Sequence, residues 1–189
     1  VLTVVNDAVC ENDETVQVTL TSAVNARVST DGAYPSAHTY TILNDDTRGV
    51  TVSAISGNTT EAGGTATFTM VLTSQPTAGV TISLSSSNTG EGTVSPASVS
   101  FSTANWATAQ TVTVTGVNDF VDEVADPMPY TVVTGACSSS DPFYSGFVVV
   151  DVSCANLDNA TAGVRVGAIS GHTTEAGGTA TFPVRLNSQ

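Results

Sequence analysis

The chain has 189 residues, of which 40% are hydrophobic and only 11% are charged. Its 17 acidic residues stand against four arginines and no lysine, which gives a formal net charge of −13. A balance this acidic argues against nucleic acid and anionic membranes as partners, because both select basic surfaces, and it favours a cation.

No run of 18 apolar residues occurs, so no segment is predicted to span or insert into a membrane. The sequence lacks an initiator Met and a signal peptide, which predicts a mature or excised segment of a longer protein. Its richness in Thr, Ser, Gly and Val predicts strands rather than helices. We expect such an acidic, lysine-free chain outside the cell.

One long repeat organises the chain. Residues 49–75 return at 163–189 with 20 of 27 positions identical, at an offset of 114 residues. This period is typical of whole small domains rather than of a solenoid unit. Residues 1–48 match the second half of the repeat, with Val4–Asp7 over Gly116–Asp119. We therefore predict the C-terminal part of a first repeat (1–48), a complete sandwich (49–162) and the N-terminal strands of a further repeat (163–189).

Within 49–162, apolar and polar residues alternate as they do in half-buried strands. The apolar positions of the expected strands are, in chain order, Val50, Val52 and Ala54; Ala66, Phe68, Met70 and Leu72; Val80, Ile82 and Leu84; Val99 and Phe101; Val112 and Val114; Tyr130 and Val132; and Phe147, Val148, Val150 and Val152. Trp106, in a turn, is expected to close one edge of the core. Seven short strands over about 110 residues predict an all-β fold of tandem immunoglobulin-like Greek-key β-sandwiches.

The three cysteines allow one disulfide. Cys137 and Cys154 lie 17 residues apart, at the expected ends of two adjacent strands. A bridge there would stabilise the fold by roughly 3 kcal/mol. The alternative is a pair of free buried thiols. Cys10 is left free or joined to a neighbouring chain.

Catalytic chemistry is not predicted. The two histidines, His38 and His172, fall in an expected strand and at a repeat position occupied elsewhere by Asn58. Nucleophile motifs, phosphate loops and Cys/His metal spacings do not occur. We therefore expect a protein that is not an enzyme.

Three motifs resemble the Calx-beta and Calx-beta-like repeats of bacterial surface proteins. They are TTEAGGTATF at 59–68 and again at 173–182, SFSTANWATAQTVTVTGVND at 100–119, and the acidic NDD at 44–46. The resemblance covers essentially the whole chain. It implies immunoglobulin-like sandwiches with a calcium site at one tip, formed by an early Glu, by acids in the loop before the sixth strand and by acids at the end of the domain.

Carried over to this sequence, the resemblance implies the calcium ligands Glu61, Asp119, Asp122, Glu123 and Asp158. Oxygen-only clusters are what a hard cation requires, and an extracellular module would bind calcium with a Kd on the order of 10⁻⁴ to 10⁻³ M. Asn118, Asn159 and Ala160 replace common acids, which lowers the expected affinity. The partial units contribute further candidates, namely Asp7, Glu11, Asp13, Glu14, Asp45 and Asp46 before the complete unit and Glu175 after it. The alternative is a solvated acidic tip without metal.

The predicted function is an extracellular structural repeat protein at the bacterial cell surface that forms a stalk, fibre or filament. Copies could join head-to-tail by strand complementation, with Gly163–Gln189 completing residues 1–48 of the next chain and Glu175 meeting Asp7, Glu11 and Asp45. The missing equivalents of Val80–Val112 favour instead a segment of a longer array. Two further alternatives are accessory repeats of a larger secreted protein and an adhesin that binds a glycan or surface protein through Tyr34, Phe143 and Tyr144.

Overall fold

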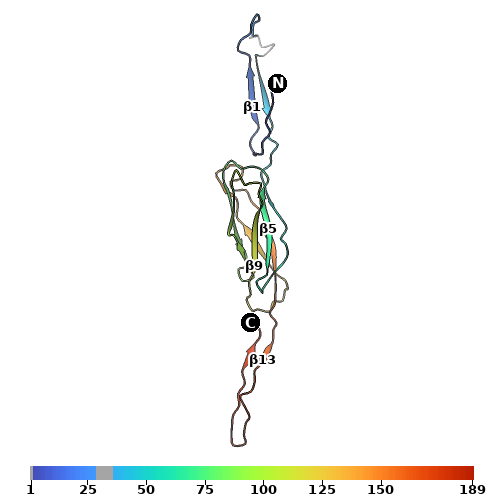
Figure 1. Ribbon diagram of the computed structural model, residues 1–189, viewed down its shortest axis with the longest axis vertical. Coiled ribbons are helices and arrows are strands. Elements are labelled where there is room, and N and C mark those ends of the chain that lie inside the picture. The colour runs from blue at the N-terminus through green and yellow to red at the C-terminus, as the bar shows by residue number, and fades with distance from the viewer. Residues whose placement is uncertain (1, 29–35) are drawn as a thin grey trace.

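The computed structural model describes residues 2–28 and 36–189. The chain is elongated: a β-hairpin, a two-sheet body and a second β-hairpin follow one another along the long axis (Figure 1). The described residues contain strands and no helix, so the predicted all-β class is confirmed. Within that part of the chain, nothing helical is long and apolar enough to cross a membrane.

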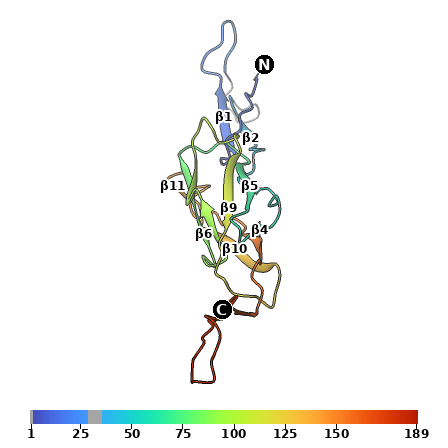
Figure 2. The ribbon, with the colours of Figure 1, turned by 60° about the horizontal axis from the view of Figure 1, so that its bottom comes forward.

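Residues 50–157 form two packed sheets (Figure 2). The four-stranded sheet is antiparallel and has the order β3 (Val50–Val52), β5 (Thr65–Leu72), β9 (Gln110–Gly116), β7 (Gly92–Ser95). The six-stranded sheet has the order β11 (Ser138–Ser139), β6 (Val80–Ser86), β10 (Met128–Thr134), β12 (Val152–Leu157), β4 (Thr59–Thr60), and β8 (Ser98–Phe101) pairs with β6. All pairs in this sheet are antiparallel except β12 with β4.

The core lies between the two sheets and follows the alternation of the sequence. Along β5 every second side chain is buried, from Ala66 to Leu72, while the threonines between them are more exposed. These side chains meet Ile82 and Val132 of the other sheet. Each large apolar side chain buried in this way stabilises the fold by roughly 2 kcal/mol. Trp106 is half-buried and packs against the cluster, as predicted.

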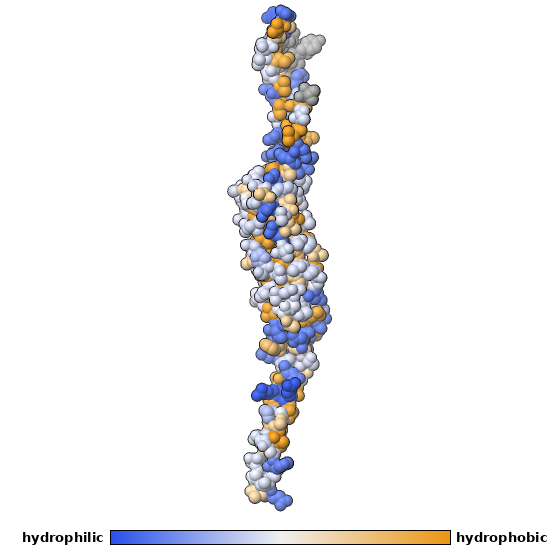
Figure 3. All heavy atoms as spheres, viewed as in Figure 1, coloured by the Kyte–Doolittle hydropathy of each residue, from blue (hydrophilic) through white to orange (hydrophobic). Residues whose placement is uncertain are grey.

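The two hairpins expose apolar faces. The first consists of β1 (Glu14–Thr19) and β2 (Ala37–Ile42), and the second of β13 (Val164–Val166) and β14 (Val184–Leu186). Val18 and Tyr40 on one hairpin, and Val184 and Leu186 on the other, are exposed. Figure 3 shows apolar side chains along both hairpins, outside the two-sheet body.

Two predictions about residues 137–157 are wrong. The last strand was expected at Phe147–Val152 but occupies Val152–Leu157. The β10–β12 ladder ends at Val132 and Val152, and beyond it the Thr134 amide and hydroxyl donate to Asp151 Oδ1 while the hydroxyl also donates to the Val149 carbonyl. Tyr144 was a candidate for an exposed aromatic patch but is fully buried. Tyr34, its proposed companion, lies outside the described residues.

The Cys137–Cys154 disulfide is also wrong, since both residues are free thiols in the core. Strand register explains the difference. Cys154 lies opposite Tyr130 in the β10–β12 pair, whereas Cys137 lies beyond the end of β10 and its amide donates to the Phe147 carbonyl (2.9 Å). Desolvation raises the pKa of both thiols above the ordinary value, so neither is readily ionised.

Thiol labelling tests this arrangement. In the native protein, a thiol-specific reagent should modify half-buried Cys10 first, and Cys137 and Cys154 only after denaturant is added, because burial blocks access and raises their pKa. Mass spectrometry of labelled peptides identifies each site. Failure of Cys137 and Cys154 to react in denaturant without reductant would contradict the assignment of free thiols.

Candidate metal centre

Acidic side chains gather at the end of the two-sheet body that faces the second hairpin. Glu61 follows β4, Asp119 and Glu123 lie between β9 and β10, and Asp158 directly follows β12. The parallel pairing of β4 with β12 sets Leu157 beside Thr60, and the Glu61 amide donates to the Leu157 carbonyl (3.0 Å). This register brings Glu61 and Asp158 to the same edge.

Gly116, the last residue of β9, allows β9 to pass close to β4 and β12 at this end of the two-sheet body. A Cβ there would collide with the Thr60 carbonyl and the Asn156 side chain. The sequence therefore needs glycine where β9 passes β4, immediately before the acidic segment begins.

Three carboxylates converge on one point. Glu61, Asp119 and Glu123 each offer an oxygen, and these oxygens all lie within 4.8 Å of one another. Two oxygens bound to one Ca²⁺ at 2.3–2.6 Å can be separated by up to about 5 Å, so this span fits calcium. Glu61 is only 4% exposed, and its Oε2 accepts the Asn159 amide (3.1 Å).

Two of these groups each have a buried carboxylate oxygen without a hydrogen-bond partner. Glu61 Oε1 and Glu123 Oε1 are buried and accept no hydrogen bond. Buried polar atoms are nearly always hydrogen-bonded, and an orphaned pair of carboxylate oxygens marks a place for an ion or water. The donor set consists only of oxygens, which suits a hard divalent cation.

Charge crowding and burial both oppose ionisation of Glu123 in this cluster. Desolvation, followed by the charges of Asp119, Asp158, Glu61 and Glu91, raises the pKa of Glu123 to about 7. Every one of these influences disfavours the ionised form of Glu123. Asp158 behaves differently, because the Ala160 amide donates to its Oδ1 (2.6 Å) and lowers its pKa.

Glu91 is a member of this acidic end that the sequence analysis missed. It is 4% exposed, burial raises its pKa, and its charge adds to that felt by Glu123. Asn156 holds it by donating from Nδ2 to Glu91 Oε2 (3.4 Å) and to the Val117 carbonyl (3.1 Å). The available signal was that Glu91 is the single acid of the polar loop between Ser85 and Gly92.

The predicted ligand Asp122 points elsewhere. It is exposed, and its Oδ2 accepts the amide of Ala162 (2.8 Å), in the linker toward the second hairpin. The structure therefore brings Glu61, Asp119 and Glu123 together, with Asp158 close by. Asp122 is not part of this cluster and instead accepts a hydrogen bond from the linker.

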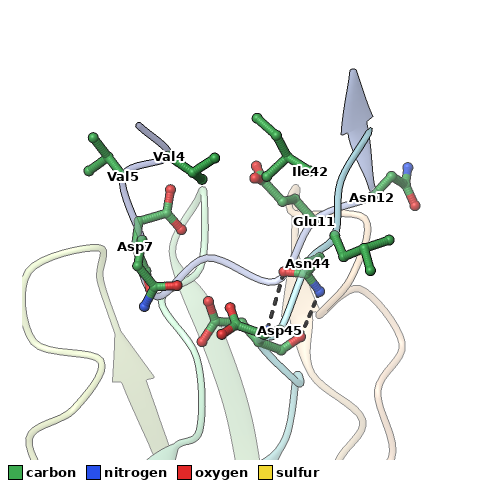
Figure 4. A pocket seen from close by; sticks show the side chains of 11 residues that line it. Val4, Val5, Asp7, Glu11, Asn12, Ile42, Asn44 and Asp45 are labelled. Atoms are coloured by element: carbon green, nitrogen blue, oxygen red, sulfur yellow. Dashed lines mark hydrogen bonds between the residues drawn. The ribbon is translucent and has the colours of Figure 1, made fainter. Parts of the chain in front are cut away.

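The candidates of the N-terminal unit lie at the base of the first hairpin. Asp7, Glu11, Asp45 and Asp46 line a pocket of ≈ 60 Å³ (Figure 4). Desolvation, with the charges of Glu14, Asp7 and Asp46, raises the pKa of Glu11. Asp13 lies next to this group and accepts the Asn44 amide (3.0 Å). Glu175 lies in the exposed turn of the second hairpin, at the opposite end of the molecule, so this chain does not bring it to them (Figure 1).

Comparison with protein-family models and with curated protein sequences gives no match. Among solved structures, the chain is similar to one described as the structure of surface layer protein SbsC, domains 1–6. The two share 15% sequence identity and a TM-score of 0.36, over 80% of this chain and 24% of that chain. This level of similarity assigns neither a fold nor a function.

The raised pKa of Glu123 predicts an inverted pH dependence in the metal-free protein. Folded Glu123 holds its proton up to about pH 7, whereas the unfolded chain releases it near 4.5, so its contribution to stability is lost as the pH rises through 7. Urea melts in chelator should give a lower free energy of unfolding at about pH 8 than at about pH 6. Glu123→Gln should weaken this difference. Equal stability at both pH values in the wild type would contradict it.

Proposed function

We propose that the protein is an extracellular structural repeat protein of Calx-beta-like type, in which immunoglobulin-like sandwiches follow one another in a calcium-stiffened stalk or fibre at a cell surface. The observation that carries the proposal is the serial arrangement of hairpin, sandwich and hairpin, built from one repeated sequence (Figure 1). Its role is mechanical rather than catalytic.

Strand order supports the immunoglobulin-like class. The four-stranded order β3-β5-β9-β7 corresponds to strands A, B, E and D, and the run β6-β10-β12 corresponds to C, F and G. The short β4 adds to the outer edge of the second sheet, beside β12. This distribution is the one that Greek-key connections produce in immunoglobulin domains.

Calcium is the cation that the acidic end fits best. The unpartnered oxygens of Glu61 and Glu123 would become ligands, and Asp119 would supply a third. A bound divalent charge would also relieve the repulsion that raises the pKa of Glu123. Glu91 and Asp158 would add negative charge close by.

Calorimetry and thermal melts test the calcium site. At a Kd of about 1 mM, 10 mM calcium would stabilise the fold by about 1.4 kcal/mol, or roughly 3–8 °C in Tm. Glu61→Gln should abolish both the binding heat and the Tm shift. Glu175→Gln, the same change at the equivalent exposed position of the other copy, is the control and should retain both. A wild-type protein whose Tm does not respond to millimolar calcium would rule the site out.

The hairpin faces favour association with further copies of the repeat. Val164, Val184 and Leu186 are exposed, but their equivalents Val50, Met70 and Leu72 are half-buried or buried in the sandwich. The first hairpin repeats this relation, since Tyr40 and Val18 correspond to the buried Cys154 and Val132. We propose that strands of another copy cover these faces, by complementation at the open edges.

Sedimentation velocity tests this association. The chain should form larger species as its concentration rises, because apolar hairpin faces leave water on contact. Val184→Asp, which places a charge on the face of the second hairpin, should shift the distribution toward monomer. Arg185→Gln, on the opposite face, makes the net charge more negative by the same single unit and is the control. A monomer at every concentration tested would contradict the proposal.

A further inference from the structure

The same main-chain hydrogen bond joins the two-sheet body to each hairpin. At one end, the Gln75 amide donates to the Ala8 carbonyl (2.6 Å), and Val9 forms an isolated parallel bridge with Gln75. At the other end, the Gln189 amide donates to the Phe120 carbonyl (2.9 Å). Gln189 is Gln75 displaced by 114 residues, and Phe120 is Ala8 displaced by 112. Equivalent positions of the repeat therefore form this bond at both ends of the two-sheet body.

An aspartate fixes the acceptor at both junctions. Asp7 Oδ1 accepts the Val9 amide (2.9 Å), and Asp119 Oδ1 accepts the Val121 amide at the same distance. Each bond closes a turn around the residue whose carbonyl accepts the glutamine amide. Phe120 has φ 63° in this turn, a left-handed conformation that is costly for an aromatic residue and persists only where the surroundings fix it.

The sandwich fixes the donor. The buried Tyr144 hydroxyl donates to the Ser74 carbonyl (2.8 Å) and lies 3.2 Å from the Ser74 amide nitrogen, which donates to it. On the other side of Gln75, Asp141 Oδ2 accepts the Thr77 amide (2.7 Å). Ser74 on one side of Gln75, and Thr77 two residues beyond it, are thus both tied to buried side chains of the sandwich, and the Gln75 amide donates to the preceding repeat.

We propose that this pair of turns is the docking surface between consecutive repeats. One repeat supplies the turn closed by its aspartate, and the Ala8 carbonyl in that turn accepts. The next repeat supplies the segment Ser74 and Gln75, and the Gln75 amide donates. The partner of each repeat at this surface is therefore another copy of the repeat. Two preorganised partners lose little conformational freedom on contact, so a single bridge can set their relative orientation. This inference goes beyond the proposed function and does not require a bound cation.

Amide hydrogen exchange by NMR on the 189-residue chain, in chelator, tests the docking surface. In the wild type, the Gln75 amide should be protected. Asp7→Ala removes the turn's acceptor and should speed Gln75 exchange by roughly fivefold, the equivalent of a hydrogen bond of about 1 kcal/mol. Asp7→Asn keeps an oxygen acceptor without the charge and should retain the protection.

Two internal references separate docking from general loosening. The Thr77 amide, bonded to Asp141 within the sandwich, should stay protected in every variant. Arg48→Ala removes the cation–π contact of Arg48 with the Phe147 ring (5.8 Å) and should leave Gln75 protected, because Ala162 stands at the equivalent position of the other junction. An unprotected Gln75 amide in the wild type, or equal protection in Asp7→Ala, would overturn the proposal.

Discussion

Repulsion among the carboxylates at one end of the two-sheet body is the constraint on which this structure depends. Glu61 and Glu91 are each 4% exposed, and the charges of both, with those of Asp119 and Asp158, act on Glu123. Burial and like charges both oppose ionisation there. Backbone amides offset part of this cost by donating to Glu61 and Asp158, whereas desolvation and like charges raise the pKa of Glu123 to about 7. A divalent cation would relieve the repulsion more fully.

The acidic end is also the place where one repeat passes to the next. Asp119 offers an oxygen to the carboxylate cluster and closes the turn whose Phe120 carbonyl binds Gln189. Asp122 binds the linker amide of Ala162 instead of joining the cluster. Charge compensation and the path of the chain are therefore set by the same short segment between β9 and β10. In a serial array, the proposed cation site would therefore lie beside the joint between one repeat and the next.

Most of the sandwich could be predicted from the alternation of apolar residues, because burial between two sheets imposes a period of two on β5, β6 and β9. The prediction failed where side-chain hydrogen bonds take over from the β10–β12 ladder, as at Thr134 with Asp151. The last strand therefore begins later than predicted, and Cys154 does not lie opposite Cys137. Glu61, Asp119 and Glu123 were predicted together because the resemblance to Calx-beta repeats implies them, and their oxygens do lie close to one another. Glu91 was missed because its burial depends on Asn156, 65 residues away in the chain.

The most direct measurement is a crystal structure grown with calcium, with anomalous scattering recorded to locate the ion. The account predicts an anomalous peak bound by oxygens of Glu61, Asp119 and Glu123, at 2.3–2.6 Å from each. It also predicts that the carboxylate oxygens without partners, Glu61 Oε1 and Glu123 Oε1, are among the ligands. A map without a peak, in which Glu61 and Glu123 turn to solvent or share a proton, would contradict the account.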